Sequence, residues 1–164
     1  MFREEDTIEI VGNVRSHSEK VTDKFGNERN KVDIYVFSHL DDVNESDKEF
    51  VEEGNTDYFE ITGRICKIDG IREFENGKHN THFVLVNNIV SEYSRLNSYL
   101  PCVCWGNLAR FATGLNVNDQ ILVKGELHSR ECVKKFSDGT EEIRVAHELL
   151  VSNIEVLPDD YKEE

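Results

Sequence analysis

The sequence predicts an all-β chain: a five-stranded barrel with one short helix, plus an N-terminal β-hairpin appendage. Short runs rich in β-branched and aromatic residues recur along the chain, which is typical of strands. Glycine stands beside Asn or Asp between several of these runs, and a single segment has helical spacing of its apolar residues. The predicted strands are 7–14, 31–38, 57–65, 81–88, 98–105, 120–127 and 148–157.

Three turn signals separate predicted strands. They are "KFGNE" at 24–28, "FENGK" at 74–78 and "FSDGT" at 136–140. Gly, Asn and Asp tolerate the positive φ that tight hairpin turns need. Each segment is therefore predicted to reverse the chain between two antiparallel strands.

The helix is predicted at about 106–114, within "GNLARFATGL". Leu108, Phe111 and Ala112 fall on one helical face, and Gly114 can end the helix. In 57–157 this helix lies between the third and fourth of five strands. That order is the order of the OB-fold, a small, partly open Greek-key barrel, although other small barrels come close to it.

The charge is unevenly distributed along the predicted domains, which are a hairpin appendage at 1–40, an acidic linker at 41–56, the barrel at 57–157 and an acidic tail at 158–164. The formal net charge is −14. Residues 1–56 hold 7 basic and 15 acidic residues, or −8, and 57–157 hold 11 and 14, or −3. Phosphate binding is driven largely by Lys and Arg, so the total argues against nucleic acid. However, most of the acidity lies outside the barrel.

The cellular setting is predicted from what the sequence lacks. No apolar stretch approaches the roughly 20 residues that cross a bilayer. The first residues, "MFREEDTIEI", are acidic where a signal peptide is basic. We expect a cytoplasmic protein, and we therefore expect Cys66, Cys102, Cys104 and Cys132 to be free thiols.

The third barrel strand, "SYLPCVCW", has two different faces. Alternation places Leu100, Cys102 and Cys104 on one face, which suits a barrel interior. Tyr99 and Trp105 lie on the other face, where each ring can stack on a nucleobase. The alternative for Trp105 is that it closes the end of the barrel core, and both can hold because one ring face can be buried and the other offered.

The sequence gives little support for a metal site or for catalysis. Cys102 and Cys104 form a Cys-X-Cys, but a structural zinc site needs four ligands, and no Cys-X2-Cys pair or nearby pair of His is present. The six His residues are scattered, and no Gly-rich phosphate loop precedes a helix. The prediction is a protein that is not an enzyme, with no cofactor and no metal.

Two motifs of the barrel resemble the bacterial-type single-stranded DNA-binding proteins. One is Cys102-Val103-Cys104-Trp105-Gly106 leading into Leu108 and Ala109, and the other is "VKGEL" at 123–127 followed by Ser129 and Arg130. The resemblance extends over 57–157 and does not cover 1–56. It implies an OB-fold that binds single-stranded DNA and assembles as a dimer or tetramer.

Phosphate contacts are expected from basic residues of the barrel: Arg64, Arg72, Lys78, Arg95, Lys124, Arg130, Lys134, Lys135 and Arg144. The resemblance favours Arg72 with Phe74, as a basic-X-aromatic turn, and Arg130. Lys134 and Lys135 flank the hairpin "CVKKFSDGTEEIRV", which could fold over a DNA strand. The predicted nucleic-acid site is therefore Tyr99, Trp105, Phe74, Arg72, Arg64, Lys124, Arg130, Lys134 and Lys135.

The chain departs from the family pattern in two places. Cys132 stands where the family often has an aromatic residue, and the tail "PDDYKEE" lacks the terminal Phe that recruits partner enzymes in the family. The predicted function is sequence-tolerant binding of single-stranded DNA in replication, recombination or repair. Two alternatives stay open: an OB-type protein-interaction adaptor with little nucleic-acid affinity, and an RNA-binding or primosome-like accessory.

Overall fold

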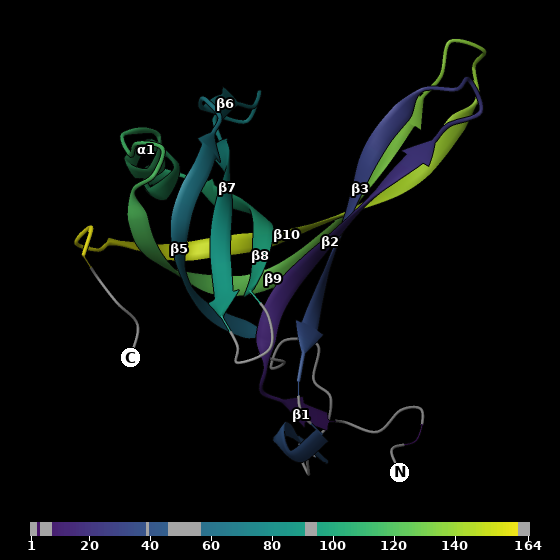
Figure 1. The fold of residues 1–164 in the computed structure, drawn as a ribbon. Coiled ribbons are helices and arrows are strands. Elements are labelled where there is room, and N and C mark those ends of the chain that lie inside the picture. Colours follow the sequence, from purple (N-terminus) through teal and green to yellow (C-terminus); the bar gives the residue numbers. More distant parts are fainter. Residues whose placement is uncertain (1–2, 4–7, 39, 46–56, 91–94, 161–164) are drawn as a thin grey trace.

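A computed structural model describes residues 3, 8–38, 40–45, 57–90 and 95–160 of the chain. A barrel carries a long projecting hairpin, and a second hairpin from the N-terminal part lies along that projection (Figure 1). The elements are β1 (Ile8–Ile10), β2 (Asn13–Thr22), β3 (Glu28–Phe37), a 3-10 turn (Leu40–Asp42), β4 (Val43–Glu45), β5 (Tyr58–Ile68), β6 (Arg72–Glu73), β7 (His79–Val90), β8 (Arg95–Trp105), α1 (Asn107–Thr113), β9 (Gln120–Lys135) and β10 (Glu141–Val156).

The barrel has the predicted strand order. Its strands are hydrogen-bonded in the order β5-β9-β10-β8-β7, and a further pairing of β5 with β7 closes the sheet. β8 and β10 run parallel to each other, while the other barrel pairs are antiparallel. The single α-helix in the described part of the chain, α1, lies between β8 and β9. The prediction of a five-stranded OB-fold barrel with one short helix is confirmed.

The core forms because alternate residues of each barrel strand point inward. Leu100, Cys102 and Cys104 of β8 are fully buried, as the sequence predicts. They pack with residues of the other strands and α1: Phe59, Ile61, Ile65, Phe83, Leu85, Ala109, Ala112, Ile121, Val123, Leu149 and Val151. Burial of this apolar set from six elements fixes the barrel and leaves the outward residues of β7, β8, β9 and β10 to form its surface.

The N-terminal hairpin consists of β2 and β3, which pair from Asn13↔Phe37 to Thr22↔Glu28. The predicted strand 7–14 is interrupted between Ile10 and Asn13. A Cβ at Gly12 would lie 2.3 Å from the carbonyl oxygen of Phe37, so this position needs glycine. The first part, β1, pairs with β4 instead. Residues 41–45 of the predicted acidic linker thus belong to the 3-10 turn and β4, whereas 46–56 lie outside the described residues.

All three predicted turns reverse the chain as expected. Gly26, Gly77 and Gly139 have φ of 82°, 82° and 86°. In each turn the glycine N–H donates to the carbonyl of the residue three positions earlier, at 3.0–3.1 Å. The positive φ explains why glycine stands at these positions.

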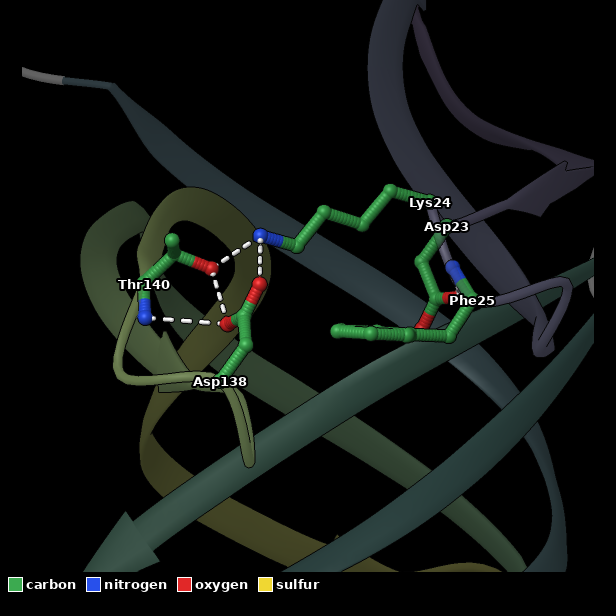
Figure 2. Close-up of polar contacts among 5 residues, drawn as sticks. All are labelled: Asp23, Lys24, Phe25, Asp138 and Thr140. Atoms are coloured by element: carbon green, nitrogen blue, oxygen red, sulfur yellow. Dashed lines mark hydrogen bonds and ion pairs between the residues drawn. The ribbon is translucent and has the colours of Figure 1, made fainter.

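The two long hairpins contact each other at their tips (Figures 1 and 2). Lys24, in the β2–β3 turn, donates to the Asp138 carboxylate at 2.8 Å and also bonds the Thr140 hydroxyl in the β9–β10 turn. The Phe25 and Phe136 rings lie 5.3 Å apart, and the Lys24 ammonium lies 5.2 and 5.0 Å from their centroids. The N-terminal hairpin is therefore anchored to the part of the barrel that projects furthest.

Candidate nucleic-acid interface

An aromatic platform lies at the end of β8, and we define it as Trp105, Phe74 and Arg72. The Trp105 and Phe74 rings are stacked, with centroids 5.5 Å apart and planes inclined by 29°. The Arg72 guanidinium carbon lies 5.0 Å from the Phe74 centroid. Three residues predicted for the site, Arg72 and Phe74 as one motif and Trp105 from the third strand, are thus in one contiguous stack.

Trp105 offers part of its ring to solvent. Its exposed fraction is 43%, and it lines an open notch of about 510 Å³ together with Gly77, Lys78, His79 and Gly106. Trp105 is therefore not a plug of the barrel core. One part of the ring packs on Phe74, and another borders a notch with a basic side chain at its edge.

Tyr99 lies on the same outward face of β8 as Trp105. It is 53% exposed, and it stands six residues before Trp105 on the strand. At about 3.3 Å per residue, roughly 20 Å separates the two positions. The two predicted stacking residues therefore lie on one strand face, Tyr99 near the middle of β8 and Trp105 at its end, with Val103 between them.

Four side chains form a cluster between the positions of Tyr99 and Trp105. Of the four, only Arg130 was predicted from the sequence. Glu148 of β10 is buried, with a side-chain exposed fraction of 7%. Its carboxylate accepts from Arg130 Nε at 3.1 Å and lies 3.4 Å from His128 Nδ1 and 3.5 Å from His82 Nε2. We call Glu148, His82, His128 and Arg130 the Glu148 cluster.

The Glu148 carboxyl is ionised in this setting. Burial alone raises the pKa of Glu148, but the hydrogen bond from His82 and the positive charge of Arg130 outweigh burial, so its pKa lies below the ordinary value. Alternation along β10 indicates an outward residue at 148, next to buried Leu149. An acidic residue directly before a core position of a barrel strand is the one sequence signal that could have drawn attention to it.

Several predicted phosphate contacts have acceptors within the protein. Arg64 donates to the carbonyl oxygens of Asn118 at 2.9 Å and Asp159 at 3.2 Å, so it ties β5 to the loop before β9 and to the C-terminal segment. Lys124 Nζ lies 3.9 Å from a Glu60 carboxylate oxygen. The structure thus places Arg64 and Lys124 away from the aromatic platform, each beside an oxygen acceptor.

The remaining basic residues lie on the projecting hairpin or at the notch. Lys134 and Lys135 are exposed near the tip of β9, and Arg144 of β10 contacts Glu142 at 3.2 Å. Lys78 borders the notch beside Trp105. Arg95 begins β8, and its side chain lies outside the described residues.

Comparison with known families decides the classification. Residues 56–157 match the model of the single-strand binding protein family, which is more than half of the chain. The chain belongs to the single-strand binding protein family. The match coincides with the barrel and its projecting hairpin, and it leaves the N-terminal hairpin outside.

One of the solved structures that are similar to this family member shares its barrel fold. A Plasmodium falciparum SSB in complex with ssDNA has a TM-score of 0.53 at 17% identity, over 63% of this chain and 96% of that chain. Two structures of PriB from Ralstonia solanacearum have TM-scores of 0.48 at 10% and 9% identity, over 63% and 62% of this chain and 100% and 98% of theirs. The comparison with curated proteins gives no match.

The cysteines of this single-strand binding family member include two in the core. Burial raises the pKa of Cys104 to about 12, and burial followed by the nearby Cys104 raises the pKa of Cys102 well above its ordinary value. All four cysteines are free. Among the described residues, no three His, Cys, Asp or Glu side chains are grouped to hold a metal ion.

The described helix is short. With seven residues, α1 cannot cross a bilayer, and the described part of the chain holds no other helix long and apolar enough to do so.

Proposed function

We propose that this chain binds single-stranded DNA with little sequence preference, as a non-enzymatic protein of replication, recombination or repair. The observation that carries the proposal is the platform of Trp105, Phe74 and Arg72. Every base has a π-face, so base stacking on an aromatic ring is sequence-tolerant and contributes about 1–3 kcal/mol per base. Membership of the single-strand binding family, and the DNA-bound state of the structural relative from Plasmodium falciparum, support this ligand.

The surface between Tyr99 and Trp105 supports a path for the single-stranded DNA across the outer face of β8, which we call the DNA track. Tyr99 and Trp105 mark its ends, and Arg72 and Lys78 supply positive charge beside Trp105. Lys134 and Lys135 lie on β9 near the tip of the projecting hairpin, opposite Glu142 and Glu141 of β10. We therefore retain Tyr99, Trp105, Phe74, Arg72, Lys134 and Lys135 as DNA contacts, and we assign Arg64 and Lys124 mainly structural roles.

The proposed assembly is a homo-oligomer, a dimer or tetramer, in the cytoplasm. Open strand edges invite pairing with another chain, and the two-stranded ribbon of β1 and β4, which is separate from the closed barrel sheet, has two such edges. Light scattering at micromolar concentration measures the mass. A monomer mass would contradict this part of the proposal without affecting the DNA ligand.

A second candidate function is an OB-type protein-interaction adaptor, which is favoured by the negative net charge of the chain. The chain carries −14, and Lys124 and Arg130 lie beside the carboxylates of Glu60 and Glu148. An adaptor with little nucleic-acid affinity would show no response to oligonucleotides. A third candidate, an RNA-binding accessory, would prefer oligo-U over oligo-dT.

The test uses oligo-dT. Trp105 is the only tryptophan, so quenching of its fluorescence reports the platform directly. Because W105A removes the probe, its affinity is measured by anisotropy of a labelled dT oligomer, and we expect binding about 5- to 150-fold weaker than wild type. The matched control is Phe111→Ala, an exposed aromatic on α1, which should leave affinity unchanged. Absence of salt-dependent binding by the wild type would favour the adaptor.

A further inference from the structure

The Glu148 cluster crosses the middle of the proposed DNA track. Glu148 is on β10 and His82 is on β7, and β8 lies between these strands in the sheet. Their contact at 3.5 Å therefore passes over β8, where outward-facing Val103 is paired with His82 and is only 2% exposed. A strand running from Tyr99 to Trp105 along the face of β8 would meet this cluster.

The cluster presents its nitrogen-bearing side chains to solvent and its carboxylate to the protein. The side chains of His82, His128 and Arg130 are 34%, 43% and 48% exposed, against 7% for Glu148. Arg130 also donates to Cys132 Sγ at 3.0 Å, which further fixes the guanidinium. The exposed rim of the cluster is thus made of groups that can carry positive charge.

The net charge of the cluster depends on its two histidines. With both neutral, the positive Arg130 and the negative Glu148 cancel. Histidine is the side chain whose charge changes between pH 5 and 8. Because the pKa of Glu148 lies below its ordinary value, its carboxylate persists through that range, and two bound protons would bring the cluster to +2.

Other charged groups lie on the elements next to the cluster. Outward positions of β9 carry Lys124, beside Glu60, and the exposed Glu126. β8 contributes the outward Tyr99, Pro101 and Val103 to this face, which add no carboxylate, amine, guanidinium or imidazole group. On the N-terminal hairpin, Asp33 lies 3.7 Å from His147.

We propose that the Glu148 cluster is a phosphate-contact site for single-stranded DNA that becomes positively charged when His82 and His128 bind protons. The ligand group is the phosphodiester, and Arg130 supplies its permanent positive charge. This inference rests on the proposed function. It assigns to the site two histidines and the buried carboxylate that both of them contact.

The experiment measures affinity for a labelled dT oligomer by anisotropy at pH 7.5 and pH 5.5, over a series of salt concentrations. We expect tighter binding at pH 5.5. Each phosphate contact on a single strand adds about 0.7 to the slope of log K against log salt. Two added contacts should therefore steepen the slope by up to about 1.4.

Variants distinguish a pH response caused by the Glu148 cluster from one caused by protonation elsewhere in the protein. H82Q/H128Q should lose most of the pH response, whereas the control H17Q/H147Q, which removes two histidines outside the cluster, should keep it. E148Q, a conservative change, should already bind more tightly than wild type at pH 7.5, because the charge of Arg130 is no longer cancelled. Circular dichroism checks that each variant is folded.

The outcomes are distinguishable from failure of the proposed function. Equal affinity of the wild type at both pH values, with binding of oligo-dT intact, overturns the proton-linked site alone. An equal loss of pH response in H82Q/H128Q and H17Q/H147Q overturns it as well. Absence of oligo-dT binding at both pH values overturns both proposals.

Discussion

The ammonium nitrogen of Lys24 lies 2.8 Å from a carboxylate oxygen of Asp138, although 114 residues separate them in the chain (Figure 2). The hydrogen bond from Lys24, followed by those from Thr140, holds the pKa of Asp138 well below its ordinary value. At the other end of the N-terminal hairpin, Val14 and Ile34 pack against the barrel core. The hairpin is thus attached at its base by apolar contacts and at its tip by a charged one.

Replacing Lys24 by Ala should loosen the tip of the projecting hairpin. The variant removes the bonds to Asp138 and Thr140 and the cation between the Phe25 and Phe136 rings. Hydrogen exchange of residues 136–140 should become faster, with little change in the global melting temperature because the contact is exposed. Lys20→Ala, an exposed lysine on the same hairpin, is the control. Equal exchange in the two variants would mean that the contact at the tips does not hold them together.

Tyr99→Ala should weaken binding of oligo-dT by about 1–3 kcal/mol, the value of one stacked base. Tyr58→Ala is the matched control, because Tyr58 is 60% exposed but lies on β5, outside the proposed track. Affinity is measured by anisotropy of the labelled oligomer. If the two variants bind equally well, Tyr99 is only a surface residue.

The barrel was predictable because its signals are local. The alternation of Leu100, Cys102 and Cys104 with outward residues, the glycines of the three turns and the single amphipathic helix each depend on a few neighbouring residues. The stack of Trp105 on Phe74 was harder to predict from the sequence. Both residues were predicted for the site from the resemblance and from alternation, but their contact depends on where the turn after β6 lies.

Two features were predicted incompletely. The sequence predicts the hairpin at 132–145 but not that the barrel strands continue into it, and it does not predict the partner of Arg130. The predicted strand 120–127 is the barrel half of β9, which continues to Lys135. The predicted strand 148–157 is the barrel half of β10, which already begins at Glu141. The outer halves are polar or carry exposed apolar residues such as Val133 and Ile143, so they lack a pattern of one-sided burial. Likewise, the carboxylate partner of Arg130 is 18 residues away, and no local pattern identifies it.

Gly125→Ala should destabilise the barrel strongly. A Cβ at this position of β9 would lie 1.9 Å from the carbonyl oxygen of Leu150 and 3.1 Å from the Phe59 ring, so backbone must move. Overpacking of this kind costs about 1–3 kcal/mol, and more where the backbone cannot yield. The measurement is urea unfolding, with Gly70→Ala as control, since nothing lies within 4 Å of a Cβ there. Equal midpoints for the two variants would contradict the close approach of β9 and β10.

Because Glu148 is ionised in the folded chain, the free energy of unfolding should fall at low pH. Its pKa is lower in the folded chain than the ordinary 4.5, so the folded state favours the carboxylate. The resulting stability is present above the ordinary pKa and is lost as pH falls through the folded pKa. E148Q should therefore be less stable than wild type at pH 7, by about 1–3 kcal/mol for hydrogen bonds to a charged group, and this difference should shrink below about pH 4. Urea unfolding from pH 7 to pH 3 measures the difference, with Glu126→Gln, an exposed carboxylate on β9, as control. A gap between E148Q and wild type that stays constant with pH would mean that the negative charge of Glu148 contributes nothing to folding.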